Sequence, residues 1–325
     1  MVKDRTLLLC LMLTIRVLTV NVPVVYADEK AQQSDPEKLM EALMSQHRNQ
    51  DIVSIRSDEL VKSYGIKLMP SIEQYLKDPS ERVRWTACVL LWQLRKHDST
   101  SPAERQHIVY LLVERLNDSS GLVHQAAPNR LLDFSAADFS EASKNLLKNF
   151  LTERLEKKAE VRDIVLVVGV ANMKTELSVL EGLLIDETQY EKKPHAGVWY
   201  GTTGWAARKA RARMGVEKDI HRCIKLVTSE PDPIVRYAIL FDDLQYVRQP
   251  QIIPVLSKYL HSPEPSLVVE SDSVLLPARY WAVGALAKIL QDFPIKKDAE
   301  LLYREEDIEV CRNWMLAQKK WKIIR

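Results

Sequence analysis

The order of apolar and polar positions predicts helices along most of the chain. Apolar residues recur at the i, i+3, i+4 spacing that places them on one helix face. In the stretch that shows this best, the face consists of Val83, Ala87, Leu90, Leu91 and Leu94. A second helix follows, with Ile108, Leu111, Leu112 and Leu116 at the same spacing. Neither helix could bury its apolar face alone, so the pattern requires neighbours that stack on it.

A five-residue signature recurs at near-constant intervals and predicts a repeat architecture. It occupies residues 83–87, 123–127, 161–165, 203–207, 235–239 and 278–282. Successive copies begin 40, 38, 42, 32 and 43 residues apart, and helical periods near 40 residues are typical of two-helix solenoid repeats. With nine glycines and five phenylalanines in 325 residues, we expect an all-α chain without a β-sheet.

The residues of the signature resemble a known repeat. An acidic-proline turn such as Asp78-Pro79 precedes Val-Arg-x-x-Ala and an aliphatic helix, and this arrangement is similar to the HEAT repeat of the armadillo-type superfamily. The resemblance covers roughly residues 50–292. It implies a right-handed α-α superhelix of about six to seven helix pairs.

The resemblance also implies a ladder of ion pairs along the stack. In HEAT repeats the arginine after the valine commonly pairs with an acidic residue of a neighbouring turn. The chain has arginine at this position in four copies and departs from it in two, at His124 and Gly204. The matching residues are Arg84, Arg162, Arg236 and Arg279.

The two ends of the chain differ from the repeats. Residues 1–27 have basic Lys3 and Arg5, then an apolar run ending in Val25-Tyr26-Ala27, which is typical of a signal peptide cleaved after Ala27. We predict a flexible lead with a short helix over residues 28–50, the repeat array over residues 51–292 and a capping helix over residues 293–325. We therefore expect an exported protein, periplasmic or secreted. The alternatives are an uncleaved membrane anchor, which Arg16 within the run disfavours, and lipid attachment at Cys10.

Charge and composition narrow the function further. The net charge of the whole chain is +2, and residues 1–27 account for all of it, so the mature protein is formally neutral. A neutral protein has no general field that would attract nucleic acid or an anionic membrane. We expect no nucleic-acid partner, and no membrane contact unless residues 1–27 are retained.

No motif in the chain predicts catalysis. The seven histidines are scattered, and neither a His-Glu-x-x-His nor a Cys-x-x-Cys motif occurs. After residue 27 an odd number of cysteines remains, at Cys88, Cys223 and Cys311, and we expect buried thiols. The sequence thus predicts no catalytic residue, no metal ligand and no cofactor.

These observations predict a non-enzymatic scaffold that binds a protein or peptide on its concave face. We expect the signature helices on the outside and the helices near 68–77, 103–116, 140–156, 217–228 and 250–260 on the concave side. The alternative is an enzyme that uses a groove of the solenoid, in the manner of HEAT-like lyases or DNA glycosylases.

Residues 195–215 contain the best candidates for partner contact. Three glycines precede a basic helix here, which fits either a connecting loop or an exposed contact loop that could also hold an anion. The expected contact residues are Trp199, Tyr200, Trp205, Arg208 and Arg211. Aromatic residues also occupy the third signature position in four copies, either as packing between repeats or as a binding stripe; these are Trp85, Trp205, Tyr237 and Tyr280.

Overall fold

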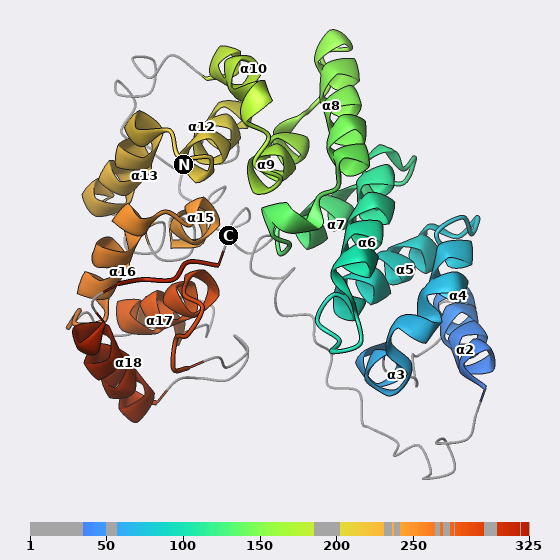
Figure 1. Cartoon of the computed structure of the whole chain (residues 1–325), viewed down its shortest axis with the longest axis horizontal. Coiled ribbons are helices and arrows are strands. Elements are labelled where there is room, and N and C mark those ends of the chain that lie inside the picture. Colours follow the sequence, from blue (N-terminus) through green and yellow to red (C-terminus); the bar gives the residue numbers. More distant parts are fainter. Residues whose placement is uncertain are drawn as a thin grey trace.

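The computed structural model is an open arch of helices that follow one another in chain order (Figure 1). It describes residues 35–49, 57–184, 202–230, 236, 241–263, 267–268, 274–275, 277–295, 304–318 and 320–324. One end of the arch is formed by α2 (Pro36–Asn49) with α3 (Ser57–Tyr64), and the other by α18 (Glu305–Ala317). The prediction of an all-helical chain is confirmed in its main feature.

The remaining helices fall into two alternating sets. Those that carry the five-residue signature or follow it directly, here called the signature helices, are α5 (Glu81–Leu94), α7 (Gly121–Leu131), α9 (Arg162–Val170), α12 (Thr203–Arg213), α15 (Phe241–Val247) and α17 (Ala278–Ile289). The intervening helices are α4 (Met69–Tyr75), α6 (Pro102–Glu114), α8 (Glu141–Glu156), α10 (Leu177–Gly182), α13 (Glu217–Ser229) and α16 (Ile253–Tyr259), and α18 follows the last signature helix. Short 3₁₀ turns join several of them: η2 (Gly65–Leu68), η3 (Arg115–Asn117), η4 (Ala136–Asp138), η5 (Lys174–Glu176) and η8 (Pro250–Ile252).

The signature helices pack on one another in chain order. Contacts run from α5 to α7, α9, α12, α15 and α17 in turn, while α6, α8, α10, α13 and α16 each pack on the signature helix that follows them. The apolar face predicted from the sequence on α5, from Val83 to Leu94, is buried here, and Ile308, Cys311 and Met315 on α18 are buried as well. The core is therefore continuous from one unit to the next.

The expected placement of the two sets is corrected by the structure. Figure 1 shows α7, α9, α12, α15 and α17 toward the inside of the arch and α8, α10, α13, α16 and α18 toward the outside. Helices on the inside of a curved stack must approach more closely, and the signature helices carry the small residues that permit this. Gly169 on α9, for example, faces Ala210 on α12 so closely that an added Cβ would lie 2.7 Å from its Cα.

Short β pairings are a second departure from expectation. Leu267–Val268 (β1) pairs in antiparallel fashion with Val274–Leu275 (β2), in the long connection that precedes α17. A single bridge also joins Leu290 to Ile323 near the end of the chain. Both lie in segments outside the helical units, where β-branched residues have no helix to continue.

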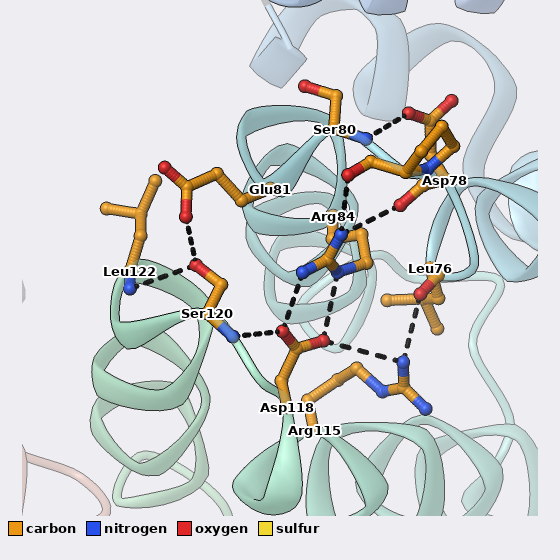
Figure 2. A network of polar contacts seen from close by, with 10 residues as sticks. Leu76, Asp78, Ser80, Glu81, Arg84, Arg115, Asp118, Ser120 and Leu122 are labelled. Atoms are coloured by element: carbon orange, nitrogen blue, oxygen red, sulfur yellow. Dashed lines mark hydrogen bonds and ion pairs between the residues drawn. The ribbon is translucent and has the colours of Figure 1, made fainter.

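The arginine of the first signature copy forms the expected link between units (Figure 2). Arg84 donates two hydrogen bonds to the carboxylate of Asp118, at 3.0 and 2.8 Å, and a third to the carbonyl of Asp78 at 2.9 Å. Asp118 also accepts from the backbone N–H of Ser120, just before α7. Its side chain is only 4% exposed, so this pair ties the turn before α5 to the turn before α7 inside the protein.

The ladder changes along the stack. Arg279 on α17 donates to Glu305 of α18 at 2.8 Å, whereas Arg236 donates to the carbonyl of Glu230 in its own turn. A second series links the intervening helices, where Arg115 donates to the carbonyl of Leu76 and Arg154 to that of Leu116. Neighbouring units are thus joined by arginine on both layers.

We predict that Asp118→Asn lowers the free energy of unfolding at neutral pH by about 3 kcal/mol, because Arg84 would keep a largely buried charge without its partner. Chemical denaturation monitored by circular dichroism measures this loss. Asp98→Asn, at an exposed position, is the matched control and should change stability little.

The same variant should also alter the response to acid. Burial raises the pKa of Asp118, but the hydrogen bonds from Arg84 and Ser120 outweigh it and hold the pKa below its usual value. The stabilisation is therefore complete above the unfolded pKa of about 3.9 and disappears as pH falls through the lower folded pKa. The difference between wild type and Asp118→Asn should persist at pH 5 to 7 and close below about pH 4. A difference that does not change with pH would contradict this assignment.

Candidate functional site

Three of the five residues expected to contact a partner are buried or largely buried. Trp205 and Arg211 are each 4% exposed, and the Arg208 side chain is 14% exposed. Trp199 and Tyr200 lie outside the described residues. We therefore replace the predicted partner contact at Trp205, Arg208 and Arg211 with a role in holding helices together.

Two buried aspartates explain this role. Asp219 on α13 accepts from Arg208 at 2.9 Å and from Arg211 at 2.8 Å. Asp243 on α15 accepts from the Trp205 indole at 2.6 Å and forms an ion pair with Lys209. Burial raises the pKa of Asp243 even though Lys209 and Trp205 favour its charged form. Arg208, Lys209 and Arg211 of α12 are thus paired with carboxylates inside the protein, which the sequence alone did not indicate.

A pocket of about 250 Å³ lies where the C-terminal ends of α9, α12 and α15 meet. Each of these helices is followed closely by a residue with positive φ: Asn172 (53°), Gly215 (95°) and Arg248 (50°). The left-handed residue ends each helix in the manner of a C-terminal cap. Because the helices are stacked side by side, their ends open onto the same space.

The charged side chains among the described residues that line this pocket are all basic. They are Lys174 from η5, Arg213 from the last turn of α12 and Arg248 after α15, and none of the described lining residues carries a carboxylate. Burial lowers the pKa of Arg213. Burial, followed by the nearby charge of Arg213, lowers the pKa of Arg248 to about 10. A bound anion would oppose both shifts, because a nearby negative charge favours the charged form of a guanidinium.

The positive charge continues beyond the pocket to the ends of α5 and α7. Arg95 and Arg130 both have a pKa lowered mainly by burial, and the charge of Arg95 contributes to the shift of Arg248. Asp133 pairs with Arg95 at 3.0 Å and accepts from the Trp92 indole at 2.7 Å. The guanidinium of Arg130 lies 4.6 Å from the centre of the Trp92 ring. We call the basic residues together the cationic strip: Arg95, Arg130, Lys174, Arg213 and Arg248.

Helix ends account for part of this arrangement, because a cation is favoured at the negative end of a helix dipole. Arg213 serves this purpose, since it donates to the carbonyl of Tyr246 in the last turn of α15. Gln249 in turn donates to the carbonyl of Arg213 at 2.5 Å. The three helix ends together carry about −1.5 charges, which is less than the three basic side chains supply. The pocket therefore keeps a positive excess.

Sequence reasoning missed this site because its residues are far apart in the chain. Arg213 lies near the end of the basic stretch within residues 195–215, whereas no motif includes Arg95 or Arg248. The repeat could nevertheless have indicated the site, because each of these arginines comes a similar distance after the start of its signature copy. The distances are 12 residues for Arg95, 10 for Arg213 and 13 for Arg248. In a stack, equivalent positions lie in a row.

Comparison with models of protein families and with curated proteins gave no match. The similarity to HEAT repeats therefore depends on the residues quoted above. Across the described ranges, no three histidine, cysteine, aspartate or glutamate side chains are grouped so that they could hold a metal ion. In that same part of the chain, no helix has the length and apolar character needed to cross a bilayer.

We predict that Gly169→Ala destabilises the protein by about 1–3 kcal/mol through overpacking. An added Cβ would lie 2.3 Å from the Tyr246 hydroxyl and 2.7 Å from the backbone of Ala210, and a backbone atom cannot move aside easily. Tyr246→Phe removes one of the two clashes, so the double variant should lose less than the two single losses combined.

Gly182→Ala on α10 is the control for this measurement. Nothing lies within 4 Å of its added Cβ, so better helix propensity should leave stability unchanged or raise it by up to about 1 kcal/mol. Denaturant melts of the variants measure these differences. Equal stability of Gly169→Ala and wild type would show that α9 and α12 are not in such close contact.

Proposed function

We propose that the protein is a non-enzymatic α-solenoid of HEAT type that binds an acidic segment of a partner protein. The signature period near 40 residues and the contacts of successive signature helices support a right-handed superhelix of about six to seven pairs. Arginine links between neighbouring turns, such as Arg84 with Asp118, support the HEAT type. Such arrays bind partners along an extended inner surface.

The observation that carries the choice of partner is the cationic strip. Five basic side chains gather at the ends of five consecutive helical units, and among the described residues Asp133 alone pairs as a carboxylate within the strip. The proposed mature protein is formally neutral, so this local excess is compensated elsewhere on the molecule. A local field of this kind selects a partner by complementary charge at the site of contact.

An acidic peptide fits this strip better than nucleic acid does. Base stacking would need a free aromatic ring beside the strip. The Trp92 ring is already covered by contacts with Arg95, Lys96 and Arg130. An extended chain with several carboxylates can follow the row of helix ends and contact one arginine after another. Each such contact at a partly exposed site is worth about 1 kcal/mol or less, so affinity would come from their number.

We predict that a fluorescent peptide of alternating glutamate and glycine binds the protein at 50 mM salt, and that a lysine and glycine peptide does not. Arg130→Gln and Arg248→Gln should each weaken binding about threefold to fivefold, the equivalent of about 1 kcal/mol. Fluorescence anisotropy gives the dissociation constants. Binding should weaken as salt rises to about 300 mM, because screening shortens the range of the charges.

The matched control for this experiment is Arg82→Gln, since Arg82 is exposed on α5 and lies outside the strip. It should bind as wild type does. Equal weakening by Arg82→Gln would mean that any positive charge suffices, and the absence of acidic-peptide binding at low salt would disprove the proposed partner class.

We further propose that the protein is exported, with cleavage after Ala27 to give a periplasmic or secreted product. The support is the order of basic, apolar and small residues over positions 1–27. Mass spectrometry of protein from the exported fraction should find a first residue of Asp28. Intact protein that begins at Met1 and partitions with membranes would instead support an uncleaved anchor.

A further inference from the structure

The pocket at the ends of α9, α12 and α15 contains a cation, Arg248, whose charge the nearby Asp133 offsets only in part, because that carboxylate pairs with Arg95. The side chain of Arg248 is largely enclosed, and its Nε is buried without a hydrogen-bond partner. No ion pair of Arg248 occurs within the described residues. Burying a charge without a partner is costly, so its retention calls for a compensating group.

The surroundings of Arg248 raise this cost further. Arg213 lines the same pocket, and its positive charge contributes to the lowered pKa of Arg248. Lys174 adds a third basic group from η5. In the described lining no acidic residue offsets them.

We propose that this pocket binds one oxyanion, a phosphoryl or carboxylate group, between Arg248, Arg213 and Lys174. Arginine presents planar N–H donors that match paired oxygens, and lysine adds a point charge. A volume of about 250 Å³ is below the usual range for pockets of drug-sized ligands. The pocket therefore suits a small anion or the charged end of a larger ligand.

This inference deepens the proposed function but can fail separately from it. A glutamate side chain of an acidic partner would be one source of the oxyanion, and a free small anion would be another. A protein that binds no acidic peptide can still bind phosphate or acetate here. Conversely, the strip can attract an acidic peptide through Arg95 and Arg130 with this pocket empty.

The competing explanation is that Arg248 only neutralises helix ends, as Arg213 does through Tyr246. The two explanations predict opposite effects of removing the charge. If Arg248 is a cap, Arg248→Met must lower the melting temperature. If Arg248 instead belongs to an anion-binding site, Arg248→Met removes a buried cation that has no partner. The melting temperature in the absence of added anion then stays the same or rises.

The experiment measures thermal unfolding of the full chain in a non-coordinating buffer, with sodium phosphate or sodium acetate added at ionic strength matched by sodium chloride. We expect phosphate, acetate or both to raise the melting temperature of wild type by about 2 °C or more at tenfold excess over the dissociation constant. The phosphate and acetate arms tell a phosphoryl ligand from a carboxylate ligand.

Two variants and one control locate the effect. Arg248→Met should abolish the anion-dependent shift, and Lys174→Met, at an exposed position, should weaken anion binding about tenfold with little change in basal stability. Arg82→Met should retain the full shift. The proposal is overturned if neither anion gives a shift beyond the chloride control, if Arg248→Met retains the shift, or if it lowers the melting temperature without anion.

Discussion

The packing of each signature helix against the next is the interaction on which the rest of this structure depends. A single helix pair cannot bury its apolar side, so stability comes from contacts between neighbours. The closest of these is the approach of α9 to α12 at Gly169 and Ala210. There the Tyr246 hydroxyl also donates to the carbonyl of Leu166 at 2.6 Å. Three successive units thus meet at one glycine.

The alignment of the helices has an electrostatic effect. When helices stack side by side and point in the same direction, their C-terminal ends form a row. The basic residues that cap these ends are then brought together. One such residue per unit is unremarkable, since each interacts well with its own helix dipole. Several basic residues in a row repel one another. The pKa of Arg248 is lowered by burial and, second, by the charge of Arg213. The stack thus converts a local preference into a shared positive surface.

Features that depend only on residues close together in the chain were predicted well from the sequence. The apolar face of α5 was predictable from the spacing of its residues, and the resemblance to HEAT repeats implied an acidic partner for Arg84 in a neighbouring turn, where Asp118 lies. The side of the arch taken by each layer was not, because it depends on how closely small residues let helices approach. The burial of Trp205 and Arg211 also escaped prediction, since their partners Asp243 and Asp219 belong to other helices. The cationic strip was missed for the same reason.

Three buried cysteines have a consequence for the timing of folding. Cys88, Cys223 and Cys311 are all free and buried, and burial raises the pKa of the Cys88 and Cys311 thiols to about 12. The folded protein therefore offers almost no thiolate to an oxidant. An unfolded chain exposes all three thiols at their ordinary pKa, and any disulfide formed then joins residues that must be packed in separate units. In an oxidising compartment, folding and oxidation of this chain compete, and the stacked core is accessible only to chains that fold first.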